Sequence, residues 1–276
     1  MPKLLRRGKV KDLYINDDGS LQFHFTDRVS AFDVILPSII PRKGEILCQF
    51  AAYWFRNLGV ENHMMDVVDK DRMNVRNLSM LPIECIVRGY AYGSFYERIR
   101  TGDIDVPHEM ALAERLPEPI FDPTTKSDEK DLPVSEAEIL RNHWLETSEL
   151  EEVRRRSLEI YANMAHRAEL GGFILADLKL EFGRDERKQI LLADSIGPDE
   201  FRLWPKEKYA VGRNQESYDK QPIRDWLASI SYKEQLETAR KEGGELPTPP
   251  ILPMELIEET TKRYIFAYKV LTGLEL

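Results

Sequence analysis

Residues 177–183 (DLKLEFG) combine side chains that can do chemistry with a spacing that brings them together. Successive side chains of a strand point to opposite faces, so Asp177, Lys179 and Glu181 would share one face while leucine and phenylalanine pack the other. That face would carry two carboxylates and an ammonium at intervals of about 7 Å. Such a set could bind a cation and an anion side by side. The alternative is a strand that only exposes its charges to solvent.

A second strand is predicted just after it, because residues 190–194 (ILLAD) are apolar up to the last one. If the two strands form a hairpin with Lys179 opposite Asp194, then Asp194 lies diagonal to Glu181 on the same face. Magnesium prefers one or two carboxylates completed by phosphate oxygens and water. We therefore predict Glu181 and Asp194 as ligands of a nucleotide-bound Mg²⁺; a register shifted by one residue would separate them.

Two lysines follow a glycine near the N-terminus, in Gly8-Lys9-Val10-Lys11. On a strand Lys9 and Lys11 would point the same way, and glycine lets the backbone approach a phosphate closely. The spacing is not that of a Walker loop. The alternative is a pair of solvated lysines.

Three further segments offer anion-binding groups. Residues 88–94 (RGYAYGS) supply a guanidinium and a hydroxyl that suit a phosphate or a carboxylate, unless they form an ordinary loop with aromatic packing. Residues 124–131 (TTKSDEKD) form either a plain polar loop or a lid that brings Lys126 and Asp131 over bound substrates. In residues 219–225 (DKQPIRD), Lys220 and Arg224 could bind a dicarboxylate.

Composition narrows the class of protein. The 276 residues are 42% hydrophobic and 32% charged, as in a globular protein, and the net charge of -9 argues against nucleic-acid binding as the main role. Two cysteines and five scattered histidines give no zinc pattern, and no Gly-x-Ser-x-Gly elbow indicates a covalent hydrolase. No signal sequence or membrane-spanning run is recognisable, so a cytoplasmic protein without a membrane partner is expected. A homo-oligomer is compatible with the sequence.

The elements that must position these groups mix strands and helices without a βαβ rhythm. We predict an α+β fold of two lobes with largely antiparallel sheets around a nucleotide-binding cleft. The lobes are residues 1–85, β-rich and nucleotide-binding, and residues 86–276, with the metal and substrate sites. The expected elements are a hairpin over 9–25, helices over 49–58, 148–170 and 254–271, strands over 80–87, 173–182 and 189–194, and an irregular stretch over 102–135.

Taken together, these segments resemble the SAICAR synthetase family from about residue 8 to residue 226. Besides the motifs above, residues 30–33 (SAFD), 41–44 (PRKG), 82–90 (PIECIVRGY), 194–199 (DSIGPD) and 202–204 (RLW) are similar to the family's blocks, in order and at compatible spacings. The resemblance implies a ligase of purine biosynthesis. It would join L-aspartate to carboxyaminoimidazole ribonucleotide with ATP and Mg²⁺, through phosphorylation of the substrate carboxylate. Phosphorylation gives a poor acyl electrophile a leaving group, so the protein mainly aligns substrates and neutralises charge.

The resemblance also implies roles for individual residues. Lys9 and Lys11 would contact ATP phosphates, and Glu84 and Ile86 would line the adenine pocket at a hinge. Glu181 and Asp194 would serve Mg²⁺. The ribonucleotide would be held by Arg88, Ser94, Asp177, Lys179 and Arg202. Asp33, Lys11, Lys126 and Asp131 would stand near the reacting groups, and Lys126 or Lys220 would reach the aspartate.

The sequence departs from the family pattern at two places. Lys130 precedes Asp131 where the lid of the family often has histidine, and Ser195 follows Asp194 where a glutamate is common. Two rival functions stay open. One is a kinase or a ligase acting on another carboxylate, and the other is a nucleotide-binding protein without catalysis.

Overall fold

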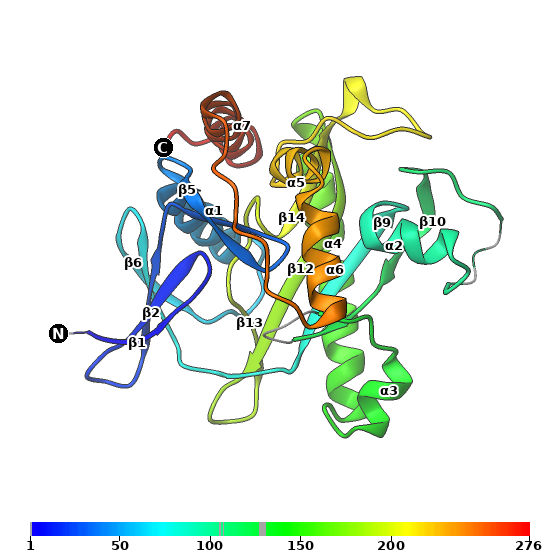
Figure 1. Ribbon diagram of the computed structural model, residues 1–276. Helices are drawn as coiled ribbons and strands as arrows, with labels where there is room; N and C mark the ends of the chain where they lie inside the picture. Colours follow the sequence, from blue (N-terminus) through cyan, green and yellow to red (C-terminus); the bar gives the residue numbers. More distant parts are fainter. Residues whose placement is uncertain (1, 105, 107, 127–130) are drawn as a thin grey trace.

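The structure is a computed structural model that describes residues 2–104, 106, 108–126 and 131–276. Within this part of the chain, strands form two main antiparallel sheets and a small hairpin (Figure 1). The first sheet has the order β1-β2-β3-β7-β6, with β1 (Lys3–Arg7), β2 (Lys11–Ile15), β3 (Leu21–Phe25), β6 (Met64–Asp69) and β7 (Arg72–Val75). The predicted N-terminal hairpin is confirmed, because Lys11 pairs with Phe25 and Ile15 with Leu21.

The second sheet is built around β12 (Phe173–Arg184), which pairs along its length with four other strands. Its path is β10-β9-β12-β13, with β14 and β8 also on β12 and β11 on β9. The bounds are β8 (Ser79–Met80), β9 (Ile83–Tyr90), β10 (Arg115–Phe121), β11 (Thr124–Thr125), β13 (Ile190–Ala193) and β14 (Phe201–Pro205). Most of β12 is buried, as expected of a central strand.

Helices cover the two sheets. α1 (Lys43–Asn57) packs on β3 and β7, α7 (Met254–Thr272) packs on α1, and α4 (Thr147–Leu170) packs on β12 and β9. The remaining helices are α2 (Gly93–Arg100), α3 (Glu136–Arg141), the 3-10 turn η1 (Lys206–Lys208), α5 (Gln221–Ser229) and α6 (Tyr232–Glu242). None of the helices in the described ranges is long and apolar enough to cross a membrane.

One hydrophobic core joins the sheets. It contains Phe23 of β3, Phe50 of α1, Leu178 of β12 and Tyr264 of α7. A smaller core lies where the hairpin of β4 (Arg28–Ala31) and β5 (Val34–Ile39) meets α5 and α6. Helices from the C-terminal part of the chain therefore pack against a hairpin from the N-terminal part.

The α+β class with antiparallel sheets is confirmed, and several element bounds need correction. The helix predicted from residue 49 begins at Lys43, because the buried first turn includes a lysine and a glycine that look like a loop in sequence. Residues 102–135, predicted as irregular, include β10 and β11; β10 buries only Leu116 and Phe121, so it shows no alternation. The chain passes from the first sheet to the second between Val75 and Ser79, and the predicted boundary at Cys85 lies within β9. The division into lobes at residue 85 stays a prediction.

Candidate functional site

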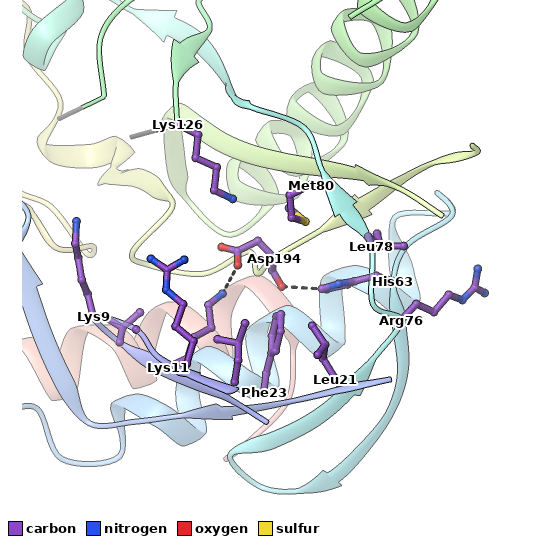
Figure 2. A pocket seen from close by; sticks show the side chains of 14 residues that line it. Lys9, Lys11, Leu21, Phe23, His63, Arg76, Leu78, Met80, Lys126 and Asp194 are labelled. Carbon is purple, nitrogen blue, oxygen red and sulfur yellow. Dashed lines mark hydrogen bonds and ion pairs between the residues drawn. The ribbon is translucent and has the colours of Figure 1, made fainter. Parts of the chain in front are cut away.

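A cavity of about 260 Å³ lies between the first sheet and the second. In Figure 2, Leu21, His63 and Leu78 lie to one side of Lys11, and Lys9 lies to the other. The lining is apolar side chains together with cations and one carboxylate: Val10, Leu13, Leu21, Phe23, Leu78 and Met80, then Arg6, Lys9, Lys11, Arg76 and Lys126, with Asp194, Gly8 and His63. An apolar surface beside a row of cations suits a planar heterocycle joined to a phosphate chain.

The turn into β2 requires a glycine. The Gly8 amide donates to the Lys11 carbonyl at 2.9 Å, and a Cβ on Gly8 would lie 2.7 Å from that oxygen. This tight turn presents Lys9 and Lys11 at the cavity. The exposed Lys9 ammonium pairs with Asp33 at 2.5 Å, so the sequence-predicted Asp33 lies beside the cation-rich wall.

Lys11 is held more firmly than Lys9. Its side chain is only 12% exposed. The ammonium lies 2.5 Å from the Asp194 carboxylate, 3.1 Å from the Ser195 hydroxyl and 4.9 Å from the centre of the Phe23 ring. The serine that replaces the family's usual glutamate therefore contacts the predicted phosphate-binding lysine directly.

A second charged cluster lies on β12 and β9. The Lys179 ammonium donates to Glu84 and to Glu181, at 2.8 Å each, while Lys126 donates to the other oxygen of Glu181. Thr124 donates to Glu84 at 3.2 Å. Lys179 and Glu181 thus share a face of β12, as the alternation of that strand predicted.

Lysines keep the two predicted metal ligands ionised. Burial alone would raise the pKa of Glu181, and so does Asp194, but Lys179 and Lys126 outweigh both and hold it below its usual value. Burial would likewise raise the pKa of Asp194, yet Lys11 and Lys179 lower it. Burial would lower the pKa of Lys179, and the surrounding carboxylates instead raise it well above the ordinary value.

The chemistry of this pair fits magnesium. Two ionised carboxylates beside three lysines match an ion that takes few protein ligands and completes its shell with phosphate oxygens and water. Within the described residues, no group of three or more histidine, cysteine or acidic side chains could hold a metal. Glu181 and Asp194 remain the predicted ligands of the ion.

The route by which Asp194 joins Glu181 differs from the prediction. Glu181 pairs with Ala193, so the predicted pairing of Lys179 with Asp194 is wrong by one residue. Continued in this register, the strand would direct Asp194 to the face of the buried Leu180. Instead β13 ends at Ala193, and Asp194 adopts a left-handed backbone with φ 60°. That turn directs its carboxylate to Lys11.

A buried chain of alternating charges lies along β9 and β14. Arg88 lies 3.0 Å from Asp122 and 3.5 Å from Asp177, Arg202 pairs with Asp177, and Arg98 donates to Asp122 at 2.7 Å. Both predicted arginines, Arg88 and Arg202, are thus held by carboxylates.

The start of α2 lies against this arginine pair. Gly93 has φ 58°, and a Cβ there would lie 2.8 Å from the Arg202 guanidinium. Ser94, the next residue, is exposed at the first turn of the helix. Arg88, Asp177 and Arg202 are thus linked by ion pairs, and Ser94 lies next to Gly93, which approaches Arg202 closely; guanidiniums of this kind can bind a phosphate.

A third cluster is almost fully buried beneath the β4–β5 hairpin. Lys43 lies 2.7 Å from Asp199, and Lys220 lies 3.7 Å from Asp199 and 3.5 Å from the Ser30 hydroxyl. Burial lowers the pKa of Lys220 to about 8, although Asp199 opposes the shift. With its long contacts, the Lys220 ammonium keeps the capacity to bind an anion.

Some predicted residues lie apart from the cavity. Glu84 and Ile86 do not line it: Glu84 binds Lys179, and the half-buried Ile86 accepts the Asp122 amide through its carbonyl at 2.8 Å. Asp131 lies close enough to Glu84 to raise the pKa of that side chain. Lys130 lies outside the described residues.

Sequence reasoning missed eight residues that line the cavity: Arg6, Leu13, Leu21, Phe23, His63, Arg76, Leu78 and Met80. Five of these residues are apolar, and an apolar residue in a sequence gives no sign that it faces a cavity. Met80, for example, begins the strand predicted over residues 80–87. Arg6, Arg76 and His63 had no motif around them. The run of cations before Gly8 was the one available signal, because Arg6 and Arg7 precede the predicted phosphate-binding turn.

Comparisons with known proteins agree with this geometry. A family model described as SAICAR synthetase matches residues 4–239. A phosphoribosylaminoimidazole-succinocarboxamide synthase of Nitrosopumilus maritimus is 49% identical over 98% of each chain, and one of Thermodesulfovibrio yellowstonii is 38% identical over 98% of this chain and 96% of its own.

Solved structures give the same result. A SAICAR synthase from Saccharomyces cerevisiae, complexed with SAICAR, has a TM-score of 0.83 at 33% identity and covers 100% of this chain and 96% of its own. A SAICAR synthetase in complex with ADP has a TM-score of 0.74 at 25% identity over 98% of each chain. The chain therefore belongs to the SAICAR synthetase family, whose members are ligases of purine biosynthesis.

Proposed function

We propose that the protein is an ATP-dependent phosphoribosylaminoimidazole-succinocarboxamide synthase. It joins L-aspartate to the carboxylate of carboxyaminoimidazole ribonucleotide and releases SAICAR, ADP and phosphate, in the cytoplasm. The observation that carries the proposal is the convergence of Lys11, Lys126 and Asp194 at a cavity with an apolar half, where Lys126 is also paired with Glu181. Family membership supports the substrates, since related proteins are complexed with SAICAR and with ADP.

The nucleotide is proposed to bind in the cavity with its base on the apolar lining. Each lysine at the cavity is already paired with a carboxylate in the structure. With a nucleotide and Mg²⁺ bound, Lys9, Lys11 and Lys126 would bind phosphate oxygens, and Glu181 and Asp194 would hold the ion. When bound, the ion would neutralise charge that develops on the transferred phosphoryl group.

The ribonucleotide is proposed to lie along β9 and β14. Arg88, Arg202 and Ser94 would hold its phosphate, and Asp177 fixes both guanidiniums from behind. Its carboxylate would then face the nucleotide-binding lysines. Lys220, buried and weakly paired, would receive a carboxylate of L-aspartate.

The reaction is proposed to take two steps. A carboxylate oxygen of the ribonucleotide attacks the γ-phosphorus, a new P–O bond forms, and ADP leaves. The aspartate amine then attacks the acyl carbon, a C–N bond forms, inorganic phosphate leaves, and the nitrogen loses a proton. The protein contributes alignment and charge neutralisation by Lys11 and Lys126, with Asp33 and Asp131 close to the reacting groups.

An omission assay tests the proposal. Purified protein is incubated with ATP, Mg²⁺, L-aspartate and carboxyaminoimidazole ribonucleotide, and ADP and SAICAR are quantified with each component left out in turn. We expect ADP and SAICAR in equal amounts. Without aspartate we expect no SAICAR and no ADP beyond a single turnover. Continuous ADP release without aspartate would indicate a kinase. Binding of ATP without any turnover would indicate a non-catalytic nucleotide-binding protein.

A further inference from the structure

His63 contacts the backbone of Asp194, one of the two predicted metal ligands. Its ring is buried, with the residue only 2% exposed, and it lines the cavity. The Nε2 atom lies 3.2 Å from the carbonyl oxygen of Asp194 (Figure 2). A carbonyl oxygen can only accept a hydrogen bond, so Nε2 carries the proton and donates.

The ring of His63 has little freedom to turn. Phe23 and Phe55 meet it edge-on, with ring centroids 5.5 Å and 5.3 Å away. The backbone is fixed as well, since the His63 amide donates to the Leu192 carbonyl at 2.9 Å and the Leu192 amide donates to Glu61 at 3.0 Å. His63 therefore contacts the end of β13 twice, at Leu192 through its backbone and at Asp194 through its ring.

The residue that the ring contacts is in an unusual conformation. Asp194 has a φ of 60°. Residues other than glycine adopt this left-handed conformation at an energetic cost, and it persists where surrounding contacts stabilise it. This same turn takes Asp194 out of the register that would point it toward the buried face of β12. Its carboxylate then lies 2.5 Å from Lys11.

We propose that His63 is a positioning residue, which holds the backbone of Asp194 in the left-handed turn and so aims its carboxylate at Lys11 and the Mg²⁺ position. The inference rests on the proposed function, because it takes Asp194 as a magnesium ligand. Removing a group that orients a metal ligand from outside the site typically lowers metal affinity by about 10- to 100-fold.

The test compares three variants by calorimetric titration of ATP in the presence and the absence of Mg²⁺. His63→Gln keeps an N–H donor at the position of Nε2, whereas His63→Met fills similar space without a donor. Asp194→Asn removes the carboxylate itself. Thermal unfolding of each variant without ligand shows whether it is folded.

We expect His63→Met to reduce the Mg²⁺-dependent gain in ATP affinity by about 10-fold or more, the range seen for such supporting groups. The gain is the ratio of the ATP affinities with and without Mg²⁺, so any direct contact of the ring with the nucleotide affects both and cancels; His63→Gln should retain most of the gain. A purely structural histidine would lower the unfolding temperature in both variants and leave the gain as in the parent protein.

The outcomes separate this inference from the function on which it rests. If folded His63→Met keeps the full gain while Asp194→Asn loses it, the positioning role is refuted and the metal assignment stands. If Asp194→Asn also keeps the full gain, the metal assignment itself fails. Should His63→Met not fold, His63→Asn replaces it, because its shorter amide cannot reach the Asp194 carbonyl.

Discussion

At the scale of single residues, the site depends on charges that are held in place before any ligand arrives. Lys11 shows this most clearly, since its ammonium lies over the Phe23 ring and is fixed by Asp194 and Ser195. Preorganised charge of this kind is worth far more to a transition state than a charge that must be ordered during the reaction. The same arrangement predicts what its removal would do.

Lys11→Met should leave the fold intact and disable ATP use. Methionine has a similar length but no charge, so it removes the ammonium that lies over the Phe23 ring while keeping an apolar side chain there. We expect kcat/KM for ATP to fall by about 100-fold or more, the size seen when one electrostatic donor is removed. Steady-state kinetics measures the effect. The control is Lys208→Met, which breaks an exposed ion pair with Glu216; equal losses in both variants would contradict a phosphate role for Lys11.

Glu200 predicts a pH dependence of stability. Burial, reinforced by Asp199, raises its pKa to about 8 from an ordinary 4.5, and its Oε2 has no hydrogen-bond partner in the described residues. The folded state therefore keeps a proton that the unfolded state loses above about pH 4.5. This contribution to stability is complete at lower pH and disappears as the pH rises through about 8.

Glu200→Gln cannot ionise and should escape this loss. Relative to the parent protein, the variant should gain free energy of unfolding between pH 5 and pH 9, on the order of 1–3 kcal/mol since one pKa unit corresponds to about 1.4 kcal/mol. Urea unfolding at a series of pH values provides the measurement, with the exposed Glu258→Gln as control. A difference that stays constant with pH would refute the assignment.

At the scale of elements, close backbone contacts fix how α1 meets the first sheet. Gly44 lies in the first turn of α1, and a Cβ there would lie 2.4 Å from the Phe25 carbonyl oxygen. Helix propensity alone would favour alanine by about 1 kcal/mol. The clash involves backbone, which cannot move aside, so it outweighs that gain.

Gly44→Ala should therefore lower the free energy of unfolding by about 2 kcal/mol or more. Gly244→Ala is a matched control, because its Cβ would meet only the Ala239 carbonyl, at 3.9 Å. Thermal and urea unfolding of both variants checks the comparison. If Gly44→Ala were as stable as the control, the close approach of α1 to β3 would be wrong.

Elements with strong local patterns were predictable from sequence, and those set by distant contacts were not. The first hairpin, β12 and α7 follow periodicity and turn residues, and they are confirmed. The start of α1 was missed, because Lys43 is buried through its bond to Asp199, 156 positions away. The β12–β13 register was wrong by one residue, because alternation cannot reveal where a strand ends in a left-handed turn. The lysines and Asp194 at the cavity were predictable from their motifs, whereas the apolar lining, from residues such as Leu78 and Met80, was not.

At the scale of the whole molecule, the cavity lies between two sheets that share one hydrophobic core. Phe23 from the first sheet and Leu178 from the second belong to the same buried cluster, and α7 near the C-terminus packs on α1 near the N-terminus. A continuous core predicts that the two sheets unfold together, because neither has an interior of its own.

Binding of Mg²⁺ with ATP should therefore stabilise the whole chain in one step. At a ligand concentration about a hundred times the Kd, the gain is about 2.7 kcal/mol. Scanning calorimetry should show a single transition that moves to higher temperature with ATP and Mg²⁺ together, and by less with either alone. In the Glu181→Gln, Asp194→Asn double variant, Mg²⁺ should add little to the effect of ATP, because both carboxylates proposed to hold the ion are gone. Two separate transitions, of which only one responds to ATP, would show that the sheets behave as independent units and that the nucleotide contacts just one of them.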